Sequence, residues 1–196
     1  MSGIGWGGDL GNLLVMPTVG TMRTNSGKEK GMSGYRSRYD KSSEEASAGY
    51  YKVLLSDYKV KVEATVTPHC GILRLVYPES EQSRIQIDLA RRVGGTSTFQ
   101  AVKVIDEHTI SGRMECTPDG GGWGNGEGKA NYTVYFYAEF SKPLKTFGVW
   151  SAKIPEGQNR KLEFIESPEF QKLTSDASVI YNVEEYEGEH IGFFTE

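Results

Sequence analysis

The sequence predicts an all-β fold, an antiparallel sandwich or barrel, and two observations carry this prediction. Hydrophobic residues alternate with polar residues at a period of two in one segment after another, as in strands with one buried face. Turn-forming residues separate these segments, and connections such as Ser56-Asp57-Tyr58 are short enough for hairpins. With 196 residues, of which 37% are hydrophobic, the chain can bury the core of one globular domain.

The clearest strand lies at residues 59–67, where Val60, Val62, Ala64 and Val66 share one face and polar residues share the other. The same period predicts strands at 84–89 and 109–117, each with one wet face. Their expected inward residues are Ile85, Ile87, Leu89, Ile110, Met114 and Cys116. Further strands are expected at 13–16, 50–55, 72–77, 99–105, 132–140, 145–150, 178–183 and 191–195.

The strand expected at 132–140 is apolar or aromatic on both faces. Every second residue from Tyr132 to Phe140 is apolar or aromatic, and Tyr135 and Tyr137 stand on the opposite face. This pattern favours a central strand that is covered on both sides. The alternative is that the two tyrosines meet another domain or a ligand.

One short helix is expected, because Ser167 followed by Pro168 is an N-cap with proline at the first helical position. We expect it to reach Leu173 at most. Three glycine-rich or polar stretches, at 1–12, 23–49 and 118–131, are interpreted as long loops of the kind that carry function.

Charge and composition exclude several classes of partner. The chain has 22 Lys and Arg against 26 Asp and Glu, a net charge of −4, so it offers no cationic field for nucleic acid or an anionic membrane. No apolar run reaches the roughly 20 residues that span a bilayer, and the first residues do not resemble a signal peptide. Cys70 and Cys116 form no Cys-x-x-Cys pair, and we expect two small buried hydrophobes, with a disulfide between them as the alternative.

Motifs for common chemistries are missing or incomplete. Residues 119–129 look like a phosphate loop, but Trp123 occupies the position of the first glycine and Ala130 has no hydroxyl for magnesium. The three histidines, His69, His108 and His190, are scattered, so we expect them in loops or at the surface rather than around a metal. No Gly-x-Ser-x-Gly elbow is present, and the acidic run at 184–189 is interpreted as a solvated turn.

Two tryptophans are the candidates for binding a ligand, and we predict no catalytic residue and no metal ligand in this chain. Trp123 lies among glycines, and Trp6 lies among glycines close to Asp9. A flat apolar ring with one donor suits the apolar face of a sugar ring, and a nearby carboxylate suits its hydroxyl groups. The alternatives are that Trp123 folds back as a lid over the sheet and that Trp6 is terminal packing.

A succession of motifs resembles the amino-terminal domain of glycoside hydrolase family 92, the exo-acting alpha-mannosidases. The motifs read SAGYYKV at 47–53, VKVEATVT at 60–67 and IQIDL at 85–89. Upstream, SGIG at 2–5 and GDLGNLLVMP at 8–17 resemble the same family. The chain departs from the family pattern at Lys41, where a histidine is expected, and at Ala48, where proline is common.

The resemblance implies a β-sandwich of the galactose-mutarotase-like type, with residues 1–196 as one domain in the amino-terminal part of a longer multidomain enzyme. It implies an inverting alpha-1,2-mannosidase acting on mannose-containing glycans, secreted, periplasmic or at the cell surface. A missing carboxy-terminal helical domain would carry the catalytic carboxylates and a calcium ion, so this chain alone is expected to be inactive.

In this reading the chain packs on that domain and contributes loops to the rim of the active site, with Trp6 as the first candidate contact and Trp123 as the second. Surface left bare by the missing domain could also let the chain associate with itself. Two other hypotheses remain open: a stand-alone carbohydrate-binding module that uses Trp6 or Trp123, and an interaction domain without a sugar ligand.

Overall fold

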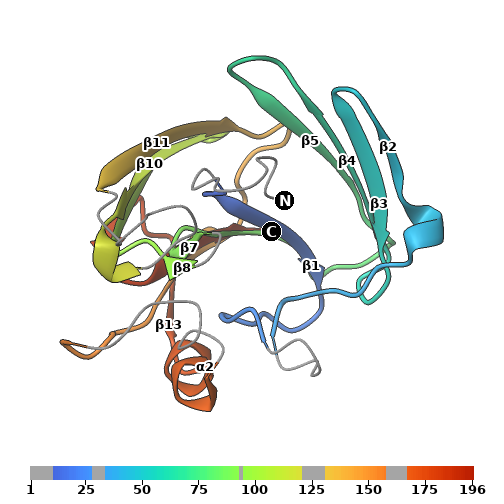
Figure 1. Ribbon diagram of the computed structural model, residues 1–196. Helices are drawn as coiled ribbons and strands as arrows, with labels where there is room; N and C mark the ends of the chain where they lie inside the picture. Colours follow the sequence, from blue (N-terminus) through green and yellow to red (C-terminus); the bar gives the residue numbers. More distant parts are fainter. Residues whose placement is uncertain (1–10, 28–33, 93–94, 121–130, 158–166) are drawn as a thin grey trace.

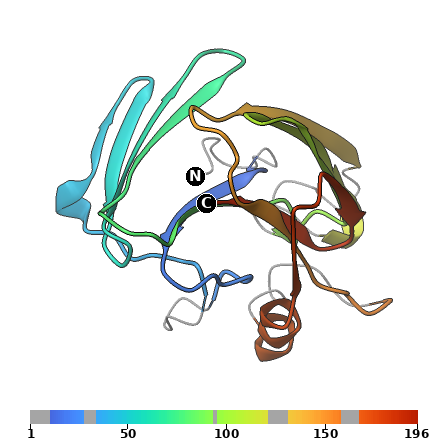
Figure 2. The same ribbon diagram turned by 180° about the vertical axis from the view of Figure 1, so that it is seen from behind.

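The structure is a computed structural model of the chain, which describes residues 11–27, 34–92, 95–120, 131–157 and 167–196. Strands dominate this part of the chain, and they form three antiparallel sheets and a two-stranded ladder. Two of the sheets lie over one face of the third, and the helix α2 lies on its opposite side (Figures 1 and 2). The predicted all-β antiparallel sandwich is therefore confirmed.

The central sheet has the strand order β1-β6-β15-β12-β13. Its strands are β1 (Leu14–Val19), β6 (Ser83–Asp88), β15 (Ile191–Thr195), β12 (Phe147–Ser151) and β13 (Ser178–Tyr181). β15 is buried along its whole length because it pairs with β6 on one side and β12 on the other.

The sheet that we call the β10 sheet has the order β11-β10-β9-β14. Its strands are β9 (Phe99–Asp106), β10 (Thr109–Cys116), β11 (Tyr132–Glu139) and β14 (Glu185–Gly188). It packs its apolar face on the central sheet. The core between them contains Ile87, Leu89, Val102, Ile110, Met114, Val149, Ile191 and Phe193, and Cys116 is fully buried nearby.

The sheet that we call the β4 sheet has the order β2-β3-β4-β5 and covers the β1 side of the central sheet. Its strands are β2 (Glu45–Ser47), β3 (Tyr50–Leu55), β4 (Val60–Val66) and β5 (Gly71–Val76). β3 has the predicted bounds. Within β4, Val60 and Ala64 are buried as expected, but Val66 is 65% exposed, since it lies near the far end of the hairpin with β5, beyond the packed part of the sheet.

The second face of β6 is buried, where the alternation predicted a wet face. Arg84, Gln86 and Asp88 point to this face and are each less than 10% exposed. Gln86 accepts a hydrogen bond from the Thr18 hydroxyl at 3.0 Å and donates to the Arg23 carbonyl at 2.8 Å. The polar side chains of β6 can point inward because backbone and side-chain groups there satisfy their hydrogen bonds.

β11 is an edge strand of the described β10 sheet rather than the covered central strand that the sequence favoured. Tyr135 and Tyr137 are 75% and 68% exposed, respectively. The acidic run at 184–189, interpreted from sequence as a turn, contains β14, which pairs antiparallel with β9. The glutamate side chains of β14 point outward at alternate positions, so the backbone of this strand can pair with β9 and extend the sheet.

Helix α2 (Pro168–Ser175) starts as predicted and continues two residues past Leu173. The Ser167 hydroxyl accepts from the Phe170 amide at 3.2 Å, and Phe170 and Thr174 are buried. Shorter elements are the 3-10 turns η1 (Lys41–Ser43) and η2 (Pro118–Gly120), and the ladder of β7 (Arg91–Arg92) with β8 (Gly95–Thr96). Among the described residues, no helix has the length and apolarity to cross a membrane.

The cysteines and histidines partly correct the expectations from sequence. Cys116 is buried as predicted, but Cys70 is exposed and both thiols are free. His190 is buried against the edge of the Phe170 ring, with 5.5 Å between ring centroids, rather than in a surface loop. His69 is exposed, and His108 is half-buried beside the Phe140 carbonyl.

Candidate functional site

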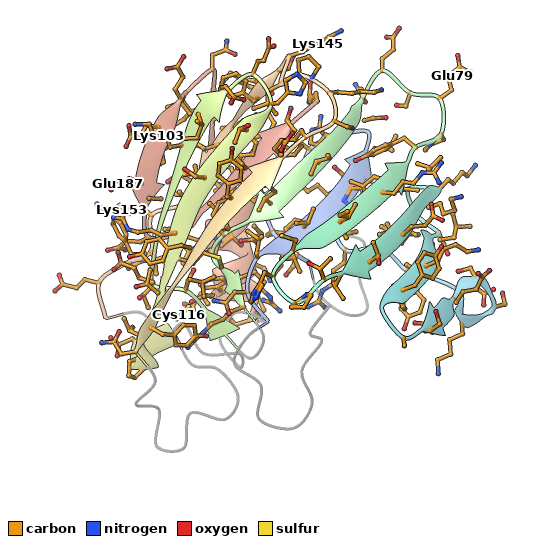
Figure 3. The ribbon with its side chains drawn as sticks, turned by 90° about the horizontal axis from the view of Figure 1, so that it is seen from above. Glu79, Lys103, Cys116, Lys145, Lys153 and Glu187 are labelled. Atoms are coloured by element: carbon orange, nitrogen blue, oxygen red, sulfur yellow. The ribbon has the colours of Figure 1, made fainter. Side chains whose placement is uncertain are left out.

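Described residues at the ends of two of the glycine-rich or polar stretches, 1–12 and 118–131, meet at one end of the sandwich, together with Arg92 of β7. We call this the polar end and define it by Asn12, Arg92, Cys116, Thr117 and Tyr132. Figure 3 shows Cys116 at the opposite end of the molecule from Lys145 and Glu79. The polar end is therefore the candidate functional site.

A chain of hydrogen bonds connects the polar end. Arg92 Nη1 donates to the Tyr132 hydroxyl at 3.3 Å, and this hydroxyl donates to Asn12 Oδ1 at 3.4 Å. Asn12 Nδ2 contacts Cys116 Sγ at 3.1 Å. Burial raises the pKa of Tyr132, with nearby Arg92 opposing the effect, so the phenol stays protonated and can act as a donor at neutral pH.

A buried carboxylate shapes the turn that presents Arg92. Asp88, at the end of β6, accepts hydrogen bonds from the Ala90 and Arg91 amides, both at 3.0 Å. It also accepts one from the Tyr35 hydroxyl at 2.6 Å. These bonds fix the backbone that leads from β6 into β7, and β7 carries Arg92 toward the polar end.

Arg92 is a buried cation with few compensating groups. Its side chain is 2% exposed, Nη2 donates to the Thr117 carbonyl at 3.2 Å, and Nε has no hydrogen-bond partner among the described residues. The guanidinium lies over the Tyr132 ring at 5.8 Å from its centroid. No carboxylate of the described residues is within ion-pair distance, so Arg92 retains unused capacity to bind an acceptor.

A large apolar cavity opens beside the polar end, between β1 and the inner face of the β4 sheet. Its volume is about 610 Å³, well beyond the voids that protein interiors normally leave. Asn12, Arg91 and Arg92 line its polar side. Its apolar walls include Leu14, Val15, Tyr39, Tyr51, Val53, Leu55, Val62, Leu73 and Leu75.

A second cavity, of about 430 Å³, lies between β5 and the connection from β11 to β12, and Thr195 and Glu196 contribute to its lining. The β4 and β10 sheets end here in the edge strands β5 and β11 (Figure 1). In the described part of the chain, the layer over the central sheet is therefore divided into two halves.

The structure leaves the predicted binding residues undecided. Trp6, Asp9 and Trp123 lie outside the described residues, as does most of the stretch that resembled a phosphate loop. What the structure adds is Asn12, Arg92 and Tyr132, which sequence reasoning missed. The adjacent arginines at the end of a strand were a visible signal, but only the fold places them next to Asn12 and Tyr132.

The described residues provide no ligand set for a metal, since no group of three His, Cys, Asp or Glu side chains among them could hold an ion. The family resemblance assigns the expected calcium ion to the carboxy-terminal helical domain, and we derive no step through it.

Comparisons with known proteins agree with this fold. The family model of the glycosyl hydrolase family 92 N-terminal domain matches residues 1–193. The class defined by this match is the sandwich domain that begins a glycoside hydrolase. The chain belongs to glycosyl hydrolase family 92, as its N-terminal domain.

Solved structures of the family are similar to the chain. The family GH92 alpha-mannosidase BT3965 from Bacteroides thetaiotaomicron matches with 27% identity and a TM-score of 0.65, over 95% of this chain and 24% of that chain. The same enzyme in complex with mannoimidazole matches with 28% identity, a TM-score of 0.65, and coverage of 95% and 23%. The glycosyl hydrolase ccman5, at 19% identity, shares the fold, with a TM-score of 0.62 and coverage of 98% and 22%.

The chain thus spans about a quarter of the length of these enzymes. No curated protein gives a significant match.

Proposed function

We propose that the chain is the non-catalytic sandwich domain of an exo-acting alpha-1,2-mannosidase and that its polar end forms part of the active-site rim. The family match over residues 1–193 carries this proposal. The likeness to an alpha-mannosidase at 27% identity supports the substrate class. The enzyme acts on mannose-containing glycans outside the cytoplasm, in a secreted, periplasmic or cell-surface location.

In the proposed reaction, one carboxylic acid protonates the leaving oxygen while a second carboxylate activates water on the other face of the sugar, which inverts the anomeric centre. Both carboxylates and the calcium ion belong to the remainder of the full-length enzyme. The role of this chain is to orient the substrate and to exclude water, with no group of its own at the reacting atoms.

Trp6, Asp9 and Trp123 are the proposed contacts with substrate. An indole ring stacks on the apolar face of a pyranose, and the carboxylate of Asp9 accepts from sugar hydroxyls. Arg92 supports the rim, since its Nε has no acceptor among the described residues and its partner Tyr132 is held in turn by Asn12. Asn12 stands three residues after Asp9 in sequence, and this ties the proposed contact to the polar end.

The proposal also assigns a partner to the open part of the sandwich. An apolar cavity of about 610 Å³ and the edges of β5 and β11 are features that a separate globular domain would cover. We propose that the catalytic helical domain packs over the sandwich and that additional polypeptide completes its layers. If the cavity and the edges of β5 and β11 are left uncovered, these surfaces favour association of the chain with itself.

Two assays test the proposal. The 196-residue chain is expected to release no mannose from alpha-1,2-mannobiose, and robust turnover by the chain alone would contradict the assignment of catalysis to another domain.

In the full-length enzyme that contains this chain, Trp6→Ala is expected to raise KM about tenfold or more, the effect of losing about 1.4 kcal/mol of binding. Lys145→Ala, at the opposite end of the molecule, is the matched control. An unchanged KM in Trp6→Ala, Asp9→Asn and Trp123→Ala would remove the polar end from the active-site rim.

A further inference from the structure

The outer face of the β10 sheet carries two exposed aromatic side chains that lie away from the core. Tyr135 and Tyr137 project from this face with 75% and 68% of their surface exposed. Their neighbours Phe136 and Ala138 turn to the opposite face and pack toward the core. Residues two positions apart on a strand lie about 7 Å from each other on one face, so the two rings stand side by side.

The strand register aligns a polar row with each ring. Tyr137 is followed across the sheet by Ser111, Lys103 and Glu185, and Tyr135 is followed by Arg113, Ala101 and Glu187. Lys103 Nζ lies 3.2 Å from Glu185 Oε2, and Arg113 Nη2 lies 3.5 Å from Glu187 Oε2. Each row places one small residue, Ser111 or Ala101, and one long basic residue, Lys103 or Arg113, between the ring and the glutamate.

These pairings keep the charged groups in place. Arg113 is held by Glu115 at 3.2 Å and by the Phe99 ring at 5.7 Å, in addition to Glu187. The tyrosine hydroxyls, in contrast, make no hydrogen bond to any other described residue. The face therefore combines two free aromatic rings with fixed donors and acceptors of both charges.

The chemistry of this face favours one class of ligand. A protein partner that seals an apolar surface would have to strip water from four charged side chains, which costs more than two tyrosines return. The mixed charges offer no field to a nucleic acid or an anionic lipid. A neutral sugar fits both features, because its C–H face stacks on an aromatic ring while its hydroxyls donate to Glu185 and Glu187 and accept from Lys103 and Arg113.

We propose that the outer face of the β10 sheet, built on Tyr135 and Tyr137, is a surface binding site for neutral oligosaccharides. It is separate from the polar end, since these side chains lie on the solvent face of the sheet, whereas Tyr132 and Cys116 lie on its inner face. Lys103 and Glu187 lie on the same flank of the molecule (Figure 3). The site does not depend on the proposed function and can be tested on this chain.

Isothermal titration calorimetry with mannotetraose and soluble alpha-mannan tests the proposal, with cellohexaose as a second arm. The 196-residue chain is expected to bind at least one of these with a Kd below about 1 mM. Tyr135→Ala or Tyr137→Ala is expected to weaken binding about tenfold, and the double variant to abolish it. Tyr135→Phe combined with Tyr137→Phe keeps the rings, so binding is expected to stay within about threefold of wild type.

The control is Tyr50→Ala, which removes a partly exposed tyrosine from the outer face of the β4 sheet and is expected to leave binding unchanged. Circular dichroism melts check that each variant is folded, as expected for side chains so exposed. Absence of binding to all three glycans overturns the proposal, and so does binding that survives in the double alanine variant. Because catalysis is not measured, failure here leaves the mannosidase assignment untouched.

Discussion

The Arg92 guanidinium lies 5.8 Å from the centroid of the Tyr132 ring and donates to the Tyr132 hydroxyl at 3.3 Å, joining strands that are 40 residues apart in sequence. Among the described residues, this contact takes the place of the carboxylate that normally pairs with a buried arginine. A guanidinium without an anionic partner costs several kcal/mol to bury, and two hydrogen bonds longer than 3.1 Å offset only part of it. We therefore expect Arg92 to destabilise the domain in which it sits, a pattern typical of functional sites.

Arg92→Met is expected to leave the free energy of unfolding of the 196-residue chain unchanged or to raise it by about 1 to 2 kcal/mol. Methionine keeps an apolar stem of similar length and removes the desolvation cost. Urea unfolding followed by circular dichroism measures this change. Arg84→Met is the matched control, because Arg84 is paired with Glu196 and donates to the Gly20 carbonyl at 2.8 Å. The control is expected to lose stability, and a loss of more than about 2 kcal/mol in Arg92→Met would contradict our account of that residue.

The Tyr35 hydroxyl makes stability depend on alkaline pH. Burial, together with the hydrogen bond to Asp88, raises the pKa of Tyr35 well above its usual range. A raised pKa means that the folded state retains a proton that the unfolded state releases. The contribution is complete below the unfolded pKa of about 10 and is lost as pH rises from there through the folded value.

We therefore expect the free energy of unfolding to fall above about pH 10, by about 1.4 kcal/mol per pH unit for each tyrosine that stays protonated in the fold. Tyr51, whose pKa burial and Glu44 raise to about 12, contributes to the same fall. Urea midpoints between pH 8 and pH 11.5 measure the slope. Tyr35→Phe is expected to reduce it by one proton, while Tyr135→Phe is the control for an exposed tyrosine. An identical slope in Tyr35→Phe and wild type would exclude Tyr35 as the source.

Sequence alone predicted the strands well and their surroundings less well, for a physical reason. A period of two reports which residues share a face, so the bounds of β3 and the inward set Ile110, Met114 and Cys116 are correct. The period does not report whether a strand is central or at an edge. β11 was therefore placed in the middle of a sheet although it lies at an edge.

The candidate site shows the same limit. Arg92, Asn12 and Tyr132 are far apart in sequence, and no local pattern indicates that a network joins them. His190 was expected in a loop or at the surface, as one of three scattered histidines, yet α2 covers it with Phe170. Loop composition pointed to Trp6 and Trp123 as ligand contacts, and for these residues the expectation stays a prediction.

Gly192 is required by the packing of Trp150 on the central sheet. A Cβ at Gly192 would lie 2.3 Å or less from three atoms of the fully buried Trp150 ring. Because the ring cannot move without opening the core, Gly192→Ala is expected to cost about 3 kcal/mol or more, which exceeds the usual overpacking penalty. Thermal unfolding of the chain measures the effect. Gly71→Ala is the control, since the atom nearest to a Cβ at Gly71 would be 4.0 Å away. A similar loss of stability in both variants would show that the conformational freedom of the glycine backbone, rather than packing, determines the cost.

The cavity beside β1 predicts an unusual response to added volume. Val62 and Val60 lie on the same face of β4, but Val62 lines the cavity of about 610 Å³ whereas Val60 is fully buried and does not. Val62→Leu places one more methylene in empty space and is expected to be neutral or to stabilise the chain by up to about 0.8 kcal/mol. Val60→Leu inserts the same group into a packed site and is expected to cost about 1 to 3 kcal/mol. Urea unfolding of both variants tests the pair. Equal losses at the two positions would mean that the cavity is already filled in solution by other parts of the protein or by a second copy, which sedimentation equilibrium would then distinguish.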